Sequence, residues 1–519
     1  MVWEYFKTNT SNAFIAKLAL FGERPQSHIP FPTFPIHFPF ENREVITLLT
    51  SDMSNLGVSG TTKPIIPELA IFGQCDGLTY EFNSRGHHGV VLLTRRSLDV
   101  MNACQQGRNI HEMLGVIPWT HDEPEALLRV LKQMADLELI ELTSSYSEQL
   151  RQNRKKARKK TFYVWLQSTD SCNLACSYCY IEKTPMFMQY DLARYAISEA
   201  KKSAAKHGFD EIVFKLAGGE PTLSWKMLSK LLQQTTADVN DQGIAVRFNV
   251  ITNGVILPQE MLDLASEGQI SISLSLDGIG YWHDIQRPLK SGSGSFRLID
   301  ANIERMLVRG VRPYILTTVT HLNSPGLSEL AEYCITRDLG FRFSFYREVA
   351  SSPKELENDN LLLSQHLGEC YEWIHDHMPD TSLYRLHRFG DMNLKVPKTR
   401  SCGIASKGMT VDTQGMVSIC QYEMSKPVGR VGDSDMIETI LNQTLYDPVA
   451  GRVDNIPVCR DCNWRYVCGS GCPMLTQRFF GTYLHSSPYC QMYRTVLPVL
   501  VELHAAQLVH YMKGGVKDA

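Results

Sequence analysis

The sequence predicts an α/β protein built around a partial parallel barrel, and three observations lead to that expectation. Apolar, strand-like runs alternate with amphipathic stretches between residues 161 and 350, as in repeated β/α units. Short glycine-rich or polar motifs follow directly after several of these runs. Seven cysteines are concentrated in residues 402–490, where their spacing marks a separate cysteine-rich domain. A smaller α+β module is expected before the barrel.

Length and composition exclude several classes of protein. A chain of 519 residues exceeds the roughly 250–300 residues at which a single core stops growing, so two or three domains are expected. A net charge of -3 offers no bulk attraction for nucleic acid. The sequence contains neither a secretory pattern nor an apolar run of the roughly 20 residues that span a membrane. We therefore expect a cytoplasmic protein with no membrane or nucleic-acid partner.

The cysteines predict metal binding rather than disulfides. Ten of the fourteen fall into spaced groups, which in a cytoplasmic chain are typical of metal sites. The other four are expected to be buried as small apolar side chains: Cys75, Cys104, Cys334 and Cys370.

The region before the barrel predicts a small module of winged-helix type at residues 66–145, after an extension, residues 1–65, whose role is open. Strand-like runs at 78–83 and 88–93 flank a connection that contains glycine, as in a hairpin. Helices are expected at 95–105, 110–114 and 123–135, the last from apolar residues at three-four spacing, and a returning strand at 137–142.

Residues 90–142 resemble in pattern the leader-peptide recognition elements typified by the peptide chaperone of pyrroloquinoline quinone biosynthesis. The resemblance rests on VVLLTRRSLDVMNACQQGRNIHEML followed by LLRVLKQMADLELIEL. It implies that the module takes up a substrate's leader as an extra strand, with backbone hydrogen bonds for affinity and side-chain pockets for register. A module that only packs on the barrel is the alternative.

Residues 146–160 are expected to form a polar, helical linker. Seven of the ten residues from Arg151 to Lys160 are basic. Such a run is typical of a solvated face, and attraction for an acidic leader is the second interpretation. Nucleic acid is disfavoured because no aromatic residues are interleaved with the charges.

Six strands are expected in the barrel, residues 161–350: 162–167, 211–216, 246–251, 271–276, 313–319 and 341–346. In such barrels the reactive groups gather at the carboxyl ends of the strands. Four motifs lie there in chain order: the cysteines of 172–179, Gly218-Gly219-Glu220-Pro221, Thr252-Asn253-Gly254 and Ser275-Leu276-Asp277-Gly278.

Cys172, Cys176 and Cys179 have the spacing C-x3-C-x2-C. Three thiolates can hold three irons of a cubane cluster, whose usual complement is four cysteines. The fourth iron is then open, and an open metal position usually indicates chemistry rather than scaffolding. A zinc knuckle or buried free thiols are the alternatives.

This spacing, with Tyr178 before the third cysteine, resembles the signature of radical S-adenosylmethionine (SAM) enzymes. The resemblance implies that the open iron binds the amino and carboxylate groups of SAM, and that the reduced cluster cleaves SAM to a 5′-deoxyadenosyl radical. It also implies the SAM contacts: Gly218, Gly219 and Glu220 at the ammonium, Ser275 and Arg287 at the ribose and carboxylate, the backbone of Tyr178 at the adenine, and Asn253 and Asp277 in the same pocket.

The cysteines of residues 401–519 follow the frame Cys402-x12-Gly415-x4-Cys420, then Cys459-x2-Cys462-x5-Cys468-x3-Cys472, then Cys490. This frame matches, gap for gap, the seven-cysteine SPASM domain of radical SAM maturases. The resemblance implies two auxiliary four-iron clusters. The outer cluster would take Cys459, Cys462, Cys468 and Cys490, and the inner cluster Cys402, Cys420 and Cys472.

The inner cluster would lack a fourth cysteine, because Gly408 stands where some relatives supply one. Cys334 and Cys370 are candidate donors. A tetrahedral zinc site of Cys459, Cys462, Cys468 and Cys472 is the alternative. Residues 351–400 are expected to be a connecting helical segment, and residues 496–503 a helix that packs on the cysteine-rich domain.

The sequence is therefore interpreted as a maturase that abstracts hydrogen from a ribosomally made precursor peptide and installs an oxidative modification, a C–C or thioether cross-link. It would need SAM, three four-iron clusters and a reducing donor such as flavodoxin or ferredoxin.

One alternative is an anaerobic sulfatase maturase that makes formylglycine. In those relatives an aspartate base follows the second SPASM cysteine, where this chain has Gln421, so Glu423 or Asp412 would have to replace it. A scaffold without SAM chemistry is the non-enzyme alternative. No catalytic acid or base is assigned.

Overall fold

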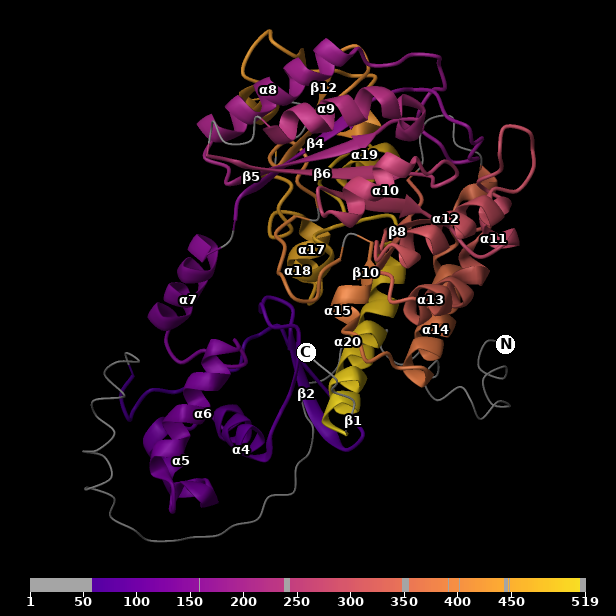
Figure 1. The fold of residues 1–519 in the computed structure, drawn as a ribbon. Helices are drawn as coiled ribbons and strands as arrows, with labels where there is room; N and C mark the ends of the chain where they lie inside the picture. The colour runs from indigo at the N-terminus through magenta and orange to yellow at the C-terminus, as the bar shows by residue number, and fades with distance from the viewer. Residues whose placement is uncertain are drawn as a thin grey trace. The chain divides into compact units, whose positions relative to one another are not determined.

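The computed structural model describes residues 58–157, 159–237, 243–347, 354–390, 392–400, 402–442, 447 and 449–513 (Figure 1). The chain divides into two compact units. The N-terminal unit runs to Arg158 and takes in Asn393–Lys398 and the chain from Arg494 onward, and the barrel unit holds Lys159–Met392 and Thr399–Tyr493. Most of the predicted extension, residues 1–65, lies outside the described residues. No helix in the described part is long and apolar enough to cross a membrane.

The N-terminal unit pairs a three-stranded antiparallel sheet, in the order β1-β2-β3, with a group of helices. Both predicted hairpin strands and all three predicted helices are confirmed, and one strand, β1, was not expected. The bounds are β1 Ala70–Cys75, β2 Leu78–Asn83, β3 Val90–Leu92, α4 Arg95–Gln105, α5 Ile110–Val116 and α6 Pro124–Asp136.

The returning strand predicted at residues 137–142 is wrong. The only pairing in that segment is an isolated bridge between Ile65 and Glu141. The cause lies at Glu138, whose φ of 56° is in the left-handed region and interrupts an extended chain. Its carboxylate is an ion-pair partner of Arg154, at 2.5 Å, on the helix α7 (Ser144–Ala157). The predicted helical linker is therefore confirmed, and it is anchored to this turn.

Helix α20 (Cys490–Met512) corrects a second expectation. Residues 496–503 were expected to pack on the cysteine-rich domain, but the chain from Arg494 onward belongs to the N-terminal unit. There Lys513, just after the helix, pairs with Asp76 in the β1–β2 turn, with 2.7 Å between Nζ and Oδ2. Val496, Leu497 and Leu503 are almost fully buried in this helix.

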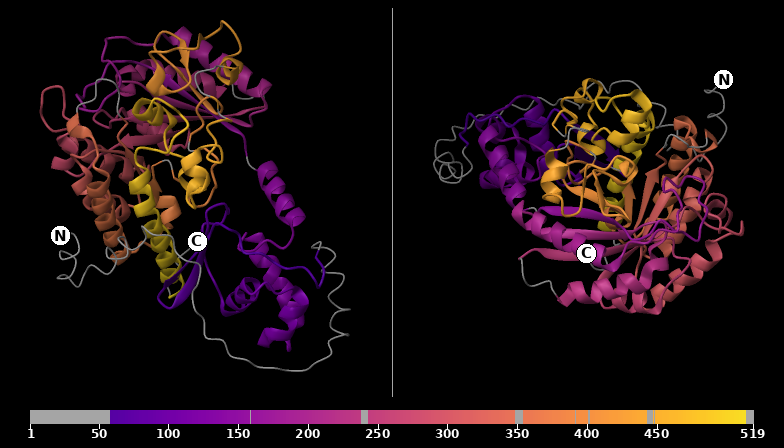
Figure 2. Two further views of the ribbon diagram at one scale, coloured as in Figure 1. Left: turned by 180° about the vertical axis from the view of Figure 1, so that it is seen from behind. Right: turned by 90° about the horizontal axis from the view of Figure 1, so that it is seen from above.

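The barrel unit is built on one ten-stranded sheet in the order β10-β9-β8-β7-β6-β5-β4-β11-β12-β13, parallel from β10 to β11. All six predicted strands are confirmed within one or two residues: β4 Thr161–Gln167, β5 Glu211–Ala217, β6 Ala245–Thr252, β7 Ile270–Ser275, β8 Tyr314–Val319 and β9 Phe341–Phe345. Helices lie along the outer, convex face of this sheet (Figure 2): α8 Tyr190–Lys206, α9 Trp225–Ala237, α10 Gln259–Ser266, α12 Phe296–Val308, α13 Leu327–Thr336 and α14 Asn360–Asp376.

Strand alternation explains this layering. In β4, Phe162, Val164 and Leu166 are buried, whereas the residues between them are more exposed. A period of two places one set against the helices and the other on the inner face. Phe214 of β5 and Phe248 of β6 stack with ring centroids 5.6 Å apart, which joins neighbouring strands on one face.

The sheet is longer at both edges than the sequence predicts. The segment 351–400, expected to be helical, contains α14 but also β10 (His387–Phe389), which pairs in parallel with β9. The cysteine-rich segment supplies β11 (Gly408–Val411), parallel to β4, followed by the short strands β12 (Met416–Ser418) and β13 (Gly429–Arg430). The cysteine-rich region is thus hydrogen-bonded directly to the first barrel strand.

The middle strand of the N-terminal sheet carries a buried carboxyl group. Glu81 of β2 is fully buried, and neither carboxylate oxygen has a hydrogen-bond partner among the described residues. It lies in register between Phe72 of β1 and Val91 of β3. Burial raises the pKa of Glu81 to about 9, so the group is protonated in the folded protein near neutral pH.

We expect Glu81 to make the folded protein less stable as the pH rises. The unfolded chain loses this proton near the ordinary value of 4.5, whereas the folded chain keeps it to about 9. Stability therefore falls through this interval, by at most about 1.4 kcal/mol per pH unit. Between about pH 5.5 and about pH 8, the thermal midpoint of the wild type should fall more than that of Glu81→Gln. The exposed Glu68→Gln should behave like the wild type, and an equal fall in all three proteins contradicts the account.

Candidate functional site

Cys172, Cys176 and Cys179 lie in the loop that follows β4, and this loop is held by backbone hydrogen bonds. The N–H of Ala175 donates to the carbonyl of Pro288 at 2.9 Å, and the N–H of Ser177 to that of Gln286 at 3.1 Å. Leu174 and Leu289 form an isolated bridge beside them. Two segments more than one hundred residues apart are thereby fixed together, and Arg287 is carried to the cysteine loop.

The glycine pair after β5 is needed for a close backbone approach. A Cβ on Gly218, whose φ is +151°, would lie 2.3 Å from the carbonyl oxygen of Thr169, and one on Gly219 would lie 2.1 Å from that of Ser171. The N–H of Gly219 donates to Thr169 at 2.7 Å. The chain that these glycines approach is therefore the one leading into Cys172. Their predicted contact with SAM stays a prediction.

Glu220 joins the ends of β5 and β6 to the cysteine loop. Its buried carboxylate accepts hydrogen bonds from Thr222 and Thr252, and from the N–H of Asn253 at 2.7 Å. Burial raises the pKa of Glu220, and these donors oppose the rise. Asn253 in turn donates to Asn173 at 2.7 Å and lies 3.8 Å from the Cys172 sulfur. Because its carboxylate is held by these protein donors, Glu220 positions the cysteine loop. An additional contact between Glu220 and SAM stays a prediction.

Asp277, Tyr178 and Arg287 form a buried network beside the cysteines. The Tyr178 hydroxyl donates to Asp277 Oδ2 at 2.5 Å and also accepts from Arg287. Arg287 Nη1 lies 3.5 Å from the same carboxylate, which is fully buried. Gln286 and the N–H of Thr318 complete the donors to Asp277. The structure thus brings three predicted site residues together. Ser275 is the half-buried last residue of β7, two positions before Asp277 in the chain.

Arg287 retains one donor that suits an anionic ligand. Its buried Nε has no hydrogen-bond partner among the described residues. Burial raises the pKa of the Cys176 thiol to about 11, and the Arg287 guanidinium beside it acts in the opposite direction. A planar guanidinium with an unmet donor fits a carboxylate, which is the group that SAM would present here. The residues present therefore fit a bound SAM.

Two thiols of residues 402–490 lie near cysteines of the sets that the SPASM resemblance implies. Burial raises the pKa of Cys468 to about 12, with further increases from Cys462, Cys459 and Cys490. Burial likewise raises the pKa of Cys420 to about 12, with contributions from Cys402 and Cys472. Cys468 and Cys420 thus each lie near other members of the expected set. The grouping of all seven thiols and their binding of iron stay predictions.

The zinc alternative is not favoured by this arrangement. Tetrahedral zinc with a metal–sulfur distance of about 2.3 Å needs sulfurs about 3.8 Å apart. Among the described residues, only His207, Asp435 and Glu438 bring three metal-ligating atoms within 4.8 Å of one another. That trio already contacts a cation, because Lys206 lies 3.1 Å from Asp435 and 3.2 Å from Glu438.

Two further sets of candidate residues either lie away from Cys420 or already have protein partners. Cys334 and Cys370, offered as inner-cluster donors, are fully buried on α13 and α14. Cys370 contributes to the raised pKa of Cys334, and neither thiol is a cause of the raised pKa of Cys420. Of the candidate bases, Glu423 is an ion-pair partner of Arg478 at 3.0 Å. Asp412 accepts from backbone N–H groups in the turn before β12.

Lys183 is a site residue that the sequence analysis missed. Its Nζ donates to the Cys179 sulfur at 2.9 Å. Charge and hydrogen bonds at a cluster sulfur influence the reduction potential of the cluster. The sequence shows only that a lysine stands four residues after the third cysteine. No pattern around it distinguishes Lys183 from other surface lysines.

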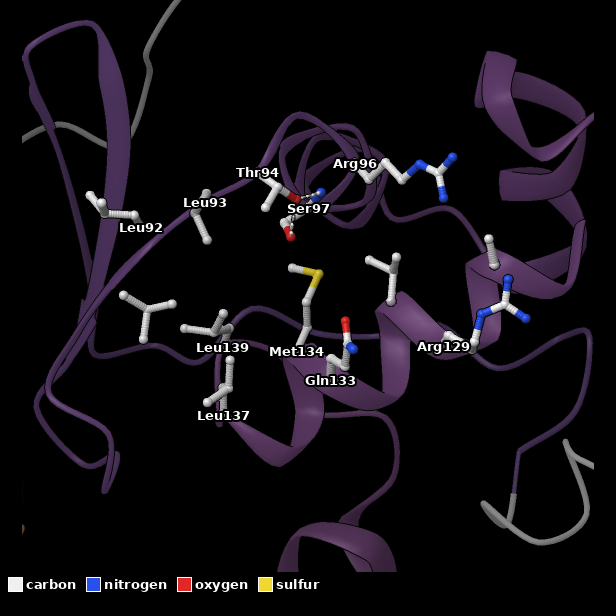
Figure 3. Close-up of a pocket in the computed structure, with 13 residues that line it drawn as sticks. Leu92, Leu93, Thr94, Arg96, Ser97, Arg129, Gln133, Met134, Leu137 and Leu139 are labelled. Carbon is white, nitrogen blue, oxygen red and sulfur yellow. Dashed lines mark hydrogen bonds between the residues drawn. The ribbon is translucent and has the colours of Figure 1, made fainter. Parts of the chain in front are cut away.

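A second candidate site is a groove in the N-terminal unit, a cavity of about 350 Å³ between β3, α4 and α6 that has an apolar end and a polar end (Figure 3). Met134 points into its centre, and Leu92, Leu137 and Leu139 line the end beside β3. The opposite end carries Arg96 and Arg129, and Arg96 pairs with Glu123 at 3.0 Å. Because β3 is the last strand of its sheet, the groove runs beside an edge that can accept another strand.

Comparison with known proteins identifies the domain around the cysteine loop. A family model described as the radical SAM superfamily matches residues 166–332, so the chain contains a radical SAM domain. A cysteine-type anaerobic sulfatase-maturating enzyme of Clostridium novyi (strain NT) is 22% identical over 348 residues, which cover 63% of this chain and 92% of that protein.

Solved structures show the same fold. The structure of anSMEcpe with bound AdoMet and Cp18Cys peptide has a TM-score of 0.54 at 16% identity, covering 67% of this chain and 99% of that one. Streptococcus suis SuiB bound to precursor peptide SuiA has a TM-score of 0.50 at 13% identity, covering 82% of this chain and 100% of that one.

We expect Asp277 to be indispensable to the stability of the barrel unit. Asp277→Ala leaves the buried Arg287 without its counter-charge and should lower the free energy of unfolding by about 3–5 kcal/mol. Asp263→Ala is the matched control, because Asp263 pairs with Arg309 at 2.7 Å on the surface, where a pair contributes about 0–1 kcal/mol. Urea titration measures both variants. Equal losses would show that the buried network is not the stronger constraint.

Proposed function

We propose that this protein is a radical SAM maturase that acts on a ribosomally made peptide. One observation carries the proposal: motifs at the ends of four neighbouring strands, β4 to β7, converge on the Cys172–Cys179 loop through hydrogen bonds. Ligands of β/α barrels bind at these carboxyl ends. The radical SAM domain supports the same assignment.

Within this proposal, Cys172, Cys176 and Cys179 hold a four-iron cluster, and Arg287 receives the carboxylate of SAM. The backbone of Gly218 and Gly219 contacts the ammonium, and Ser275 the ribose. When bound and reduced, the cluster and SAM supply a 5′-deoxyadenosyl radical for hydrogen abstraction. Asp277 holds Arg287 and Tyr178 in place, and Lys183 places a positive charge at Cys179.

The cysteine-rich region would be a SPASM domain with two auxiliary clusters. An oxidative cross-link or a comparable oxidation releases one electron from the substrate radical, and the inner cluster at Cys402, Cys420 and Cys472 is the proposed acceptor. Pairing of β11 with β4 supports this role, because it ties Cys402 and Cys420 to the barrel that holds the cysteine loop. The outer cluster would pass the electron to a donor–acceptor protein such as flavodoxin or ferredoxin.

The groove of the N-terminal unit supports a leader-bearing peptide as the substrate. An added strand at β3 would gain backbone hydrogen bonds, and apolar leader residues would enter the cavity around Met134. Arg129 and Arg96 at one end suit an acidic leader residue. The solved SuiB complex contains a precursor peptide, in keeping with a peptide substrate here.

A sulfatase maturase is the second candidate, favoured by the similarity that spans 92% of the Clostridium novyi protein. Its weakness is the missing base, because Gln421 follows Cys420 and Glu423 and Asp412 are engaged elsewhere. A reducing compartment such as the cytoplasm suits both candidates.

We expect the anaerobically reconstituted protein to hold about twelve irons and to cleave SAM. Replacing Cys172, Cys176 and Cys179 with alanine should remove about four irons and all 5′-deoxyadenosine. The control, Cys334→Ala with Cys370→Ala, should change neither, because these thiols pack between α13 and α14. Iron analysis and chromatography of the nucleoside give both readouts. Full iron without SAM cleavage in the wild type would favour a scaffold.

We expect Leu92→Asp to impair peptide modification while leaving SAM cleavage in the absence of peptide unchanged. A charge on the edge strand β3 makes the apolar end of the groove unfavourable for a leader. Val116→Asp is the control, since Val116 is exposed on α5 of the same unit and does not line the groove. Mass spectrometry of a co-expressed peptide measures the modified fraction. Equal modification by both variants would remove the leader role from the groove.

A further inference from the structure

Two tyrosine rings join the two cysteine-bearing segments of the barrel unit. Tyr180 directly follows Cys179, and Tyr422 lies two residues after Cys420 in the short helix η5 (Gln421–Glu423). Their ring centroids are 4.3 Å apart, with the ring planes tilted by 43°. Among the described residues, this is the one aromatic contact between the loop after β4 and the segment 402–490.

The surroundings of each ring place the pair between the Cys172–Cys179 loop and the segment that carries Cys420. Tyr180 is the residue next to Cys179, and the N–H of Tyr422 lies 3.5 Å from the Cys420 sulfur. The two rings in contact therefore join residues beside a thiol of each segment. The guanidinium carbon of Arg347 lies 5.6 Å from the centre of the Tyr422 ring, on a cation–π contact that fixes this ring.

Ordinary core packing does not explain the pair well. Both side chains remain partly accessible, although they lie where the strand-end loops and the cysteine-rich segment meet. The Tyr422 phenol accepts a hydrogen bond from Arg347, which together with the cation–π contact holds this ring against Tyr180. What the pair provides is continuous aromatic contact across the gap between the segments.

We propose that the Tyr180–Tyr422 pair is the electronic contact between the SAM cluster and the inner auxiliary cluster. The inference rests on the proposed function, in which Cys179 and Cys420 hold iron. As an alternative to passage through the outer cluster, one electron would return from the reduced inner cluster, across the two rings in contact, to the oxidised SAM cluster. No bond forms or breaks in this step, and no proton moves, because the rings act only as a polarisable path.

The test uses the full-length reconstituted protein, reduced with dithionite, desalted and mixed with SAM. Each SAM cleaved to methionine and 5′-deoxyadenosine consumes one electron from the protein. The nucleoside takes its hydrogen atom from glycerol in the buffer, equally for every variant. The first equivalent draws on the SAM cluster, and any later equivalent draws on an auxiliary cluster. Rapid-quench chromatography counts the nucleoside, and freeze-quench electron paramagnetic resonance follows the reduced auxiliary signal.

The wild type and Tyr422→Phe should show a second phase, in which the auxiliary signal disappears as more 5′-deoxyadenosine forms. Tyr422→Leu should keep the first phase, lose the second and retain its reduced auxiliary signal, because the aromatic contact is gone. Tyr333→Leu, a buried tyrosine on α13, is the matched control and should resemble the wild type. Tyr422→Met replaces the leucine variant if that variant binds less iron.

Two failures are distinguishable. A wild type without any first phase overturns the proposed function and this inference with it. A normal first phase followed by an unchanged second phase in Tyr422→Leu overturns the electronic role of the pair alone.

Discussion

The buried carboxylate of Asp277 is the interaction on which the rest of the candidate site depends. It holds Tyr178 from the cysteine loop and Arg287 from the segment after β7, and it accepts from the β8 backbone at Thr318. A buried cation such as Arg287 is tolerable only beside a counter-charge of this kind. The guanidinium is held in place by this pair, and its buried Nε has no hydrogen-bond partner among the described residues.

The second constraint is the hydrogen-bonded sheet that runs from β10 to β13. Because β11 pairs with β4 from Gly408↔Tyr163 to Val411↔Leu166, the cysteine-rich segment is an extension of the barrel rather than an appended module. The same strand, β4, leads into Cys172 on one side and neighbours the strand between Cys402 and Cys420 on the other. Strand β4 therefore sets the spacing between the Cys172–Cys179 loop and the segment from Cys402 to Cys420. The Tyr180–Tyr422 contact joins the same two segments.

Local sequence patterns predicted most of the helices and strands, but they did not predict which distant strands pair. Short strand-like apolar runs located all six barrel strands, continuous in β5 and alternating in β9. The short strands β10 and β11 escaped, since three or four residues carry too little pattern and their pairing partners are remote in sequence. The strand predicted at residues 137–142 is wrong although its apolar pattern is typical of a strand. Glu138 has a positive φ there and forms an ion pair with Arg154. The two thiol sets stay a prediction, and the partners of Glu220 and the position of Lys183 needed the folded chain.

The central claim, oxidative modification of a peptide, is tested most directly by mass spectrometry of a short peptide encoded beside this gene and co-expressed with the protein. The account predicts a loss of about two mass units per event, mapped to linked side chains, because a hydrogen atom and then a proton with an electron leave the peptide. An unchanged peptide, under conditions in which the same protein still forms 5′-deoxyadenosine, would contradict the account and favour a sulfatase-type substrate.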